Sequence, residues 1–169
     1  MPRSVDEHRA ASPVRVVCAV VTVSDTRTLE TDRGGAMVAE MLQAAGHAVA
    51  RREIIPDEPD RMRPLVRELV AEAAVEAVLL TGGTGIGQRD QTYETISALL
   101  TKPMPGYGEL FRMLSFDDIG PAAMLSRAVG GAIDGKIVLT MPGSTAAVRL
   151  AMEKLILPEI AHLVHEAGK

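Results

Sequence analysis

The sequence predicts an α/β fold: a single domain built as a three-layer α/β/α sandwich around a mostly parallel sheet. Apolar, β-branched runs alternate along the chain with segments whose apolar residues recur at helical spacing, as in strand–helix–strand units. The apolar runs are nearly continuous, which is typical of strands that helices cover on both faces. No repeat, linker or low-complexity tract divides the 169 residues. We therefore expect one domain over residues 14–169, behind a flexible tail over residues 1–13.

In the first half of the domain, three strands are predicted to alternate with two helices. The residues from Val14 to Val23 form an almost unbroken β-branched run, so a buried strand is expected there. Gly46 is suited to end the first helix, and Pro64 is tolerable only in the first turn of the second. The predicted elements are a strand over 14–23, a helix over 34–45, a strand over 47–55, a helix over 60–74 and a strand over 77–81.

The second half is predicted to be mainly helical, with one strong strand. The predicted elements are helices over 92–100, 107–119 and 121–129, a strand over 136–141 and a helix over 145–167, with a proline-rich break over 102–106. A turn at Asp134-Gly135 precedes the strand. Pro158 is expected to kink or break the last helix, because proline lacks the backbone donor.

Composition narrows the class of function. The aromatic content is 2%, there is no Trp, and the net charge is −4, which disfavours a nucleic-acid-binding surface. The single cysteine, Cys18, excludes an intrachain disulfide and lies in an apolar run, so we expect a buried, inert thiol. Residues 1–12 lack the apolar core of a signal peptide, and no stretch reaches the roughly 18 apolar residues of a spanning helix. A cytoplasmic protein is expected.

The most distinctive stretch is residues 82–90, which we call the glycine loop. Four glycines within six residues follow a predicted strand, and Arg89 and Asp90 come next. A loop of this kind between a strand and a helix presents backbone N–H groups to an anion. It lacks the third glycine of the dinucleotide fingerprint, where Gln88 stands, and the Lys and hydroxyl residue of a P-loop. An anion cradle and an ordinary glycine-rich turn both fit this pattern.

Small or acidic residues also follow other predicted strands: Ser24-Asp25, Asp57 and Pro142-Gly143-Ser144. Because parallel strands end at one edge of a sheet, these loops are expected to converge with the glycine loop on one crevice. Asp57 and Asp90 beside phosphate-binding backbone would make a Mg2+ site, although each alone is also explained as a turn or capping residue. The pair Ser126-Arg127 fits either a phosphate contact or a surface pair.

A series of motifs occurs in a fixed order between about residue 15 and residue 165. They are Thr22-Val23-Ser24-Asp25, Pro56-Asp57-Glu58, Thr81-Gly82-Gly83-Thr84-Gly85, Arg89-Asp90-Gln91-Thr92, Pro105-Gly106-Tyr107-Gly108-Glu109, Arg112-Met113-Leu114-Ser115-Phe116, Ala123-Met124-Leu125-Ser126-Arg127-Ala128 and Met141-Pro142-Gly143-Ser144. Together they resemble the molybdopterin adenylyltransferases of the Mog/MoaB type, which are related to the gephyrin G domain. The stretches 106–127 and 141–145 resemble the MoaB branch most, and Tyr93 stands where the family commonly has proline.

The resemblance implies a homotrimer, or a hexamer of two trimers, that transfers AMP from ATP to the terminal phosphate of molybdopterin and releases pyrophosphate. A downstream molybdate-inserting protein is an implied partner. The two functional aspartates of the family correspond to Asp57 and Asp90, as catalytic residues and Mg2+ ligands. Its substrate contacts correspond to Ser24, Asp25, Gly82, Gly83, Thr84, Gly85, Ser126, Pro142, Gly143 and Ser144, and the chemistry of the loops adds Arg89 and Arg127.

This reaction agrees with what the residues offer. A phosphate monoester is already anionic near neutral pH, so positioning and charge neutralisation, without a general base, would carry the catalysis. Two alternatives stay open on the sequence. One is a catalytically silent pterin- or nucleotide-binding oligomeric scaffold of the same pathway, because some members of the MoaB branch lack the activity. The other is a generic nucleotide-binding domain that does not bind pterin.

Overall fold

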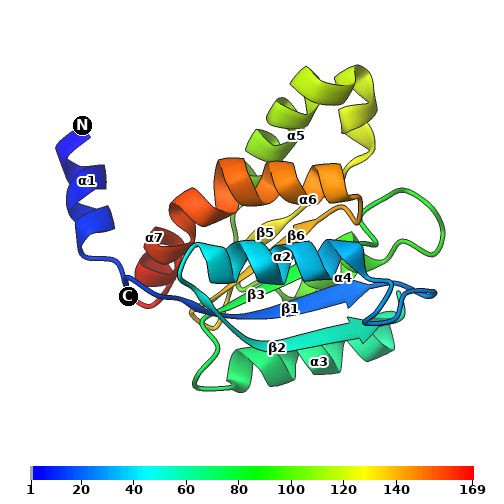
Figure 1. The fold of residues 1–169 in the computed structure, drawn as a ribbon, viewed down its shortest axis with the longest axis horizontal. Coiled ribbons are helices and arrows are strands. Elements are labelled where there is room, and N and C mark those ends of the chain that lie inside the picture. Colours follow the sequence, from blue (N-terminus) through cyan, green and yellow to red (C-terminus); the bar gives the residue numbers. More distant parts are fainter. Residues whose placement is uncertain (1) are drawn as a thin grey trace.

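The computed structural model describes residues 2–169, which surround one six-stranded sheet (Figure 1). The strands are β1 (Val17–Val23), β2 (Ala48–Ile55), β3 (Ala77–Thr81), β4 (Lys102–Pro103), β5 (Gly130–Ile133) and β6 (Lys136–Met141). Their order across the sheet is β2-β1-β3-β6-β5-β4. The first four in this order are parallel, and β5 is antiparallel to both its neighbours. The predicted α/β class and mostly parallel sheet are confirmed.

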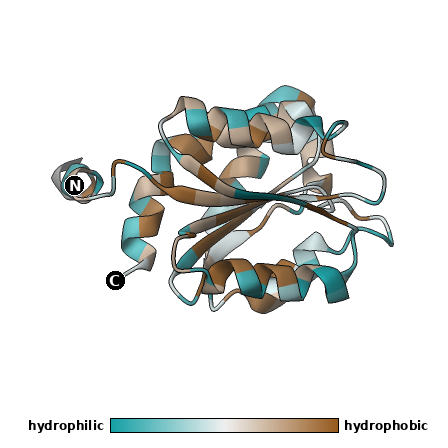
Figure 2. Cartoon of the chain, turned by 60° about the horizontal axis from the view of Figure 1, so that its bottom comes forward, coloured by the Kyte–Doolittle hydropathy of each residue, from teal (hydrophilic) through white to brown (hydrophobic). Residues whose placement is uncertain are grey.

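Helices lie on both faces of the sheet, as Figure 2 shows with the sheet seen between two helical layers. The helical elements are α1 (Pro2–Ala10), α2 (Arg33–Ala44), α3 (Pro59–Ala71), α4 (Thr92–Leu99), α5 (Pro105–Ile119), the 3-10 segment η1 (Gly120–Leu125), α6 (Thr145–Ala151), the π-helical segment η2 (Met152–Ile156) and α7 (Leu157–Ala167). One core contains side chains of α2, α5, α6 and α7, and the other contains side chains of α3 and α4. The three layers follow from this division.

Successive residues of β1 supply the two cores in turn, which explains its unbroken apolar sequence. Cys18 and Val20 face the α2 side, whereas Ala19 and Val21 face the α3 side. Burial, and then the nearby charge of Glu76, raises the pKa of the Cys18 thiol to about 12. The prediction of a buried, inert thiol is therefore confirmed.

The predicted helix over 121–129 is wrong in its second half. Helical backbone ends with η1, and the chain continues as strand β5, which pairs with both β6 and the short strand β4. A Cβ on Gly130 would lie 2.5 Å from Leu139 Cδ2 and 2.9 Å from Tyr107 Cδ1, so glycine lets these side chains cross the strand. A strand beginning with two glycines has no apolar alternation, and β4 lies inside the predicted proline-rich break, so neither was predicted.

The turn and the last helix agree with the sequence. Asp134 (φ 49°) and Gly135 (φ 82°) both have positive φ and join β5 to β6 as a two-residue hairpin. The last helix is interrupted as predicted at Pro158. The wider η2 turn precedes α7, and Pro158 lies in the first turn of α7, where its missing N–H is tolerated.

The N-terminal segment differs from the unstructured tail that was expected. Within residues 2–10 the backbone is helical, and this α1 stands beside α7, to which Arg9 is tied by an ion pair with Glu159 (Figure 1). Residue 1 lies outside the described residues. A helix can still move as a unit, so the flexibility of this segment stays a prediction. Among residues 2–169, no helix combines the length and the apolar character needed to cross a bilayer.

Candidate functional site

Four parallel strands end at one edge of the sheet, and the loops that follow them form the candidate site. At this edge Val23 pairs with Ile55, Thr22 with Thr81, and Thr81 with Met141. The loops after β1, β2, β3 and β6 therefore begin side by side. The predicted convergence of these loops on one edge of the sheet is confirmed.

The glycine loop passes very close to its neighbours. Gly82 has φ 102° and Gly83 has φ 67°, in the left-handed region that favours glycine. A Cβ on Gly82 would overlap the carbonyl oxygen of Val23, and a Cβ on Gly83 would overlap the Asp57 carboxylate and the Thr92 hydroxyl. The loop is thus packed directly against Asp57, which an ordinary surface turn does not require.

Asp57 lies almost buried, with 6% of its surface exposed. Its Oδ1 accepts a hydrogen bond from the Gln91 N–H at 3.1 Å, and its own N–H donates to Asp25 Oδ1 at 3.1 Å. Burial raises the pKa of Asp57 to about 6; the Gln91 hydrogen bond opposes this, and the charges of Asp90 and Asp25 add to it. The residue that caps α3 is Glu58, so Asp57 is not there as a helix cap.

Asp90 and Arg89 have separate roles in the loop. Asp90 Oδ2 accepts the Gly87 N–H at 2.8 Å and folds the loop back on itself, whereas Gln91 occupies the N-cap position of α4. Arg89 donates two hydrogen bonds to Asp25, at 3.1 and 2.8 Å. These bonds, followed by the Asp57 N–H, lower the pKa of Asp25. Arg89 thus neutralises Asp25 and also lies 3.9 Å from Glu58, whereas Asp57 and Asp90 form no ion pair among the described residues.

Asp57 and Asp90 fit one kind of metal site. Across residues 2–169, no group of three or more His, Cys, Asp or Glu side chains is placed to hold a metal by itself. Mg2+ is commonly bound by one or two carboxylates together with water and substrate phosphates. The pair therefore suits Mg2+ that binds together with a nucleotide, and the predicted Mg2+ site stays a prediction.

Arg127 holds the glycine loop through hydrogen bonds to the loop backbone. Its Nε donates to Gly85 O at 2.8 Å, it forms an ion pair with Glu94, and its guanidinium lies 5.1 Å from the centroid of the Tyr93 ring. The guanidinium that was predicted to contact phosphate is therefore engaged within the protein. Ser126 is different, because its buried Oγ has no hydrogen-bond partner among the described residues.

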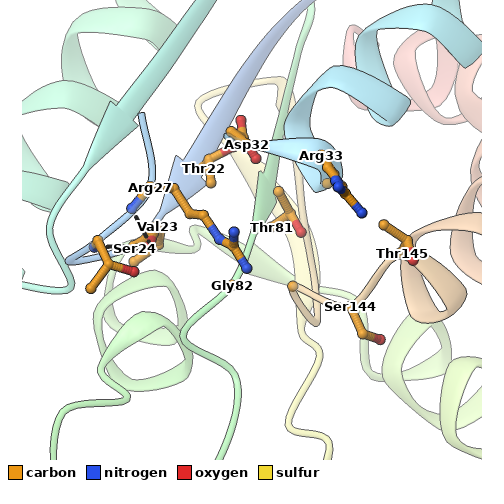
Figure 3. Close-up of a pocket in the computed structure, with 13 residues that line it drawn as sticks. Thr22, Val23, Ser24, Arg27, Asp32, Arg33, Thr81, Gly82, Ser144 and Thr145 are labelled. Carbon is orange, nitrogen blue, oxygen red and sulfur yellow. Dashed lines mark hydrogen bonds between the residues drawn. The ribbon is translucent and has the colours of Figure 1, made fainter. Parts of the chain in front are cut away.

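Beside the glycine loop lies a cavity of about 560 Å³, which we call the α2 cavity (Figure 3). It is lined by Thr22, Val23, Ser24, Thr26, Arg27, Asp32, Arg33, Gly34, Thr81, Gly82, Gly143, Ser144 and Thr145. Four predicted site residues, Ser24, Gly82, Gly143 and Ser144, belong to it. Asp57 and Asp90 do not, so the candidate site has two adjoining parts that share the start of the glycine loop.

Asp32 organises the floor of the α2 cavity. Its carboxylate accepts hydrogen bonds from Thr22 Oγ1 at 2.7 Å, Gly35 N at 2.9 Å and Arg52 Nη2 at 3.0 Å. Burial opposes the charge, but these bonds outweigh it and lower the pKa of Asp32. Asp32 therefore caps α2 as an ionised carboxylate whose charge is balanced by Arg52. The sequence signal that could have revealed Asp32 is an aspartate just before a predicted helix, which is a typical N-cap. No local pattern marked Arg27 or Arg33 as residues of the site.

Comparison with known proteins decides the family. Residues 19–162 match the family described as "Probable molybdopterin binding domain". The chain belongs to this molybdopterin-binding family. It is 49% identical over 167 residues to molybdenum cofactor biosynthesis protein B of Halalkalibacterium halodurans, with 98% of each chain covered.

Solved structures agree with this assignment. A crystal structure of a molybdenum cofactor biosynthesis protein B matches with a TM-score of 0.89 at 52% identity, over 92% of this chain and 98% of that one. A structure of MogA matches with a TM-score of 0.81 at 25% identity, over 89% and 99%. Membership of the Mog/MoaB group is confirmed, and the identities favour the B-type members.

Proposed function

We propose that this member of the molybdopterin-binding family is a Mg2+-dependent molybdopterin adenylyltransferase of molybdenum cofactor biosynthesis. It would transfer AMP from ATP to the terminal phosphate of molybdopterin and release pyrophosphate. Family membership and the names of the relatives support the pathway. The observation that carries the reaction is the juxtaposition of Asp57 and Asp90 with the glycine loop, because it joins two carboxylates to a backbone suited to phosphate.

The chemistry requires no proton transfer. An oxygen of the terminal phosphate of molybdopterin attacks the α-phosphorus of ATP and forms a new P–O bond. The bond from the α-phosphorus to the oxygen that bridges to the β-phosphorus breaks, and its electron pair leaves with pyrophosphate. Both partners are anions, so catalysis consists of holding them in line and neutralising their charge.

The residues of the two parts of the site have distinct tasks in this scheme. Asp57 and Asp90 would hold Mg2+, which supplies charge neutralisation at the phosphates. Backbone N–H groups of the glycine loop would bind phosphate oxygens, and Arg127 fixes that loop through Gly85 O. Arg89 keeps Asp25 neutralised, which limits the negative charge that the substrates meet.

The proposal includes a homotrimer or a hexamer. The α5–η1 segment projects from the rest of the fold (Figure 1), and it carries several exposed apolar side chains. They are Leu110, Met113, Phe116, Ile119, Met124 and Leu125. A group of exposed apolar side chains on one segment is typical of a protein interface. A molybdate-inserting protein as a later partner, and a cytoplasmic location, stay predictions.

The test uses purified protein with ATP, Mg2+ and molybdopterin, and measures AMP–molybdopterin and pyrophosphate. We expect Asp57→Asn and Asp90→Asn to lower turnover roughly 100-fold or more, because each removes a charge that acts at the reacting phosphates. Glu40→Gln, an exposed change in the middle of α2, should leave turnover unchanged. Pterin binding without AMP transfer would instead support the silent scaffold. ATP binding without pterin binding would support a generic nucleotide-binding domain.

A further inference from the structure

The two parts of the candidate site carry opposite charge. Arg27 and Arg33 line the α2 cavity, and Asp32, the one acidic residue among the described residues of its lining, is already paired with Arg52. The cavity is therefore net positive, although the whole protein has a net charge of −4. On the other side of the glycine loop, three aspartates lie together with Arg89.

The two arginines approach the cavity from different elements. Ser24 Oγ accepts hydrogen bonds from Thr26 N at 3.3 Å and Arg27 N at 3.1 Å, and this turn brings the Arg27 side chain back over Gly82 (Figure 3). Arg33 begins α2 and extends toward the turn after β6 (Figure 3). Two guanidinium groups thus converge on one space from opposite walls.

The rest of the lining also suits phosphate oxygens. Six hydroxyl side chains line the cavity, and two of them, those of Thr22 and Thr81, donate to Asp32 and to Pro142 O. The other four are those of Ser24, Thr26, Ser144 and Thr145. Three glycines, Gly34, Gly82 and Gly143, also line the cavity and leave backbone without side chains there. A Cβ on Gly34 would lie 3.2 Å from Gly143 O, so the start of α2 packs closely on the turn after β6. The lining contains no aromatic side chain on which a base or a pterin could stack.

We propose that the α2 cavity is a polyphosphate subsite that binds the β- and γ-phosphates of ATP, and then the pyrophosphate, through Arg27 and Arg33. This proposal rests on the proposed adenylyl transfer and assigns one end of its nucleotide. Gly82 lines the cavity and begins the glycine loop that packs on Asp57, so a triphosphate that extends from the cavity along this loop would bring its α-phosphate toward the carboxylates.

The assignment gives the two arginines a task in the reaction. When the bond between the α-phosphorus and the bridging oxygen breaks, negative charge develops on the leaving pyrophosphate. Guanidinium groups already placed in the α2 cavity neutralise that charge without reorganisation. Arg27 and Arg33 therefore contribute more as the bond breaks than when ATP first binds.

The first test measures the binding of inorganic pyrophosphate, without metal, to the full chain by titration calorimetry at fixed ionic strength. In the double variant Arg27→Gln/Arg33→Gln, we expect Kd to rise at least about tenfold, because two charge-assisted contacts are lost. The matched control is Arg61→Gln/Arg67→Gln, two exposed arginines on α3 across the sheet, which makes the same change of charge. The control should bind pyrophosphate like the unmodified protein, and binding should weaken with added salt.

The second test separates this inference from the proposed function. In the transfer assay, Arg27→Gln/Arg33→Gln should lower kcat/KM for ATP and leave KM for molybdopterin unchanged, and Arg27→Lys/Arg33→Lys should restore part of the loss. If no AMP is transferred at all, but pyrophosphate binding still depends on the two arginines, the transferase proposal fails and the subsite stands. If AMP is transferred and the Gln variant binds pyrophosphate normally, the subsite is wrong and the transferase stands.

Discussion

Replacing Asp57 by Asn is expected to make the metal-free protein more stable while it abolishes the proposed activity. The pKa of Asp57 rises from the ordinary value of 3.8 to about 6 in the folded protein. At roughly 1.4 kcal/mol for each unit of pKa, this corresponds to at most about 3 kcal/mol of lost stability above pH 6. Water still reaches the neighbouring carboxylates, so we expect about 1–2 kcal/mol. An Asn side chain keeps the acceptor for Gln91 N and removes the charge.

The sign of the pH dependence follows from the raised pKa. Below about pH 4 Asp57 is protonated in both the folded and the unfolded chain, so the two proteins differ little. Between about pH 4 and pH 6 the unfolded carboxyl ionises while the folded one, opposed by burial and two neighbouring carboxylates, stays protonated, so stability is lost over this range and the loss is complete above about pH 6. The advantage of Asp57→Asn should therefore be small at pH 4 and complete at pH 7.5.

The assay is urea unfolding with EDTA at both pH values and at one protein concentration, because an oligomer unfolds in a concentration-dependent way. Asp57→Asn should raise the urea midpoint at pH 7.5 only, and Glu40→Gln, an exposed change on α2, should raise it at neither pH. A lower midpoint for Asp57→Asn at pH 7.5, or an equal gain at both pH values, would refute the electrostatic reasoning.

Three further substitutions test the structure around the site. Gly83→Ala combines positive φ with overlap on two side chains and should cost about 2–4 kcal/mol of unfolding free energy. Its control Gly46→Ala, with φ 88° and no atom within 4 Å, should cost only about 1 kcal/mol. A similar loss in both variants would contradict the close packing of the glycine loop. Asp32→Asn should cost about 2–3 kcal/mol of unfolding free energy at pH 7, because it leaves Arg52 without its ion-pair partner. The folded pKa of Asp32 is lowered, so this difference should shrink as acid protonates the carboxylate of the unmodified protein. A difference that is constant down to pH 3 would contradict the ion-pair explanation. Tyr107→Phe removes a buried hydroxyl that donates at 2.8 Å to a backbone carbonyl and should lower stability by about 1 kcal/mol in urea unfolding, with AMP transfer unchanged.

The elements that could be predicted from the sequence are those whose apolar pattern depends only on neighbouring residues. The β1 run is apolar at nearly every position because both faces are buried, and this can be read without knowing its partners. Strand β5 begins with Gly130, which lets Tyr107 and Leu139 approach across the strand, and Gly131, which lets the backbone of β4 at Lys102 come close. That requirement comes from residues distant in the sequence, so a pattern of neighbours cannot reveal it.

Within the candidate site, too, some residues could be predicted from local sequence pattern and others depend on tertiary contacts. Asp57 and the glycine loop stand directly after strands, and parallel pairing brings such positions to one edge, so their convergence follows from topology. Arg27 and Arg33 lie in and just after a loop with no regular pattern, and only the turn at Ser24 and the start of α2 direct them to one cavity. Arg127 stands beside a hydroxyl and looks available, but its tertiary contacts engage it in supporting the loop.

The charge distribution explains why the site would bind metal and nucleotide together. Without ligand, burial and the neighbouring carboxylates make ionised Asp57 costly, so this side of the site favours a cation. Two carboxylates without a third protein ligand hold Mg2+ weakly, and phosphate oxygens must complete its coordination. In our proposal the α2 cavity, with Arg27 and Arg33, would attract those phosphates from the opposite side of Gly82. Each ligand would then increase the affinity of the site for the other, so Mg2+ and ATP should bind with positive coupling.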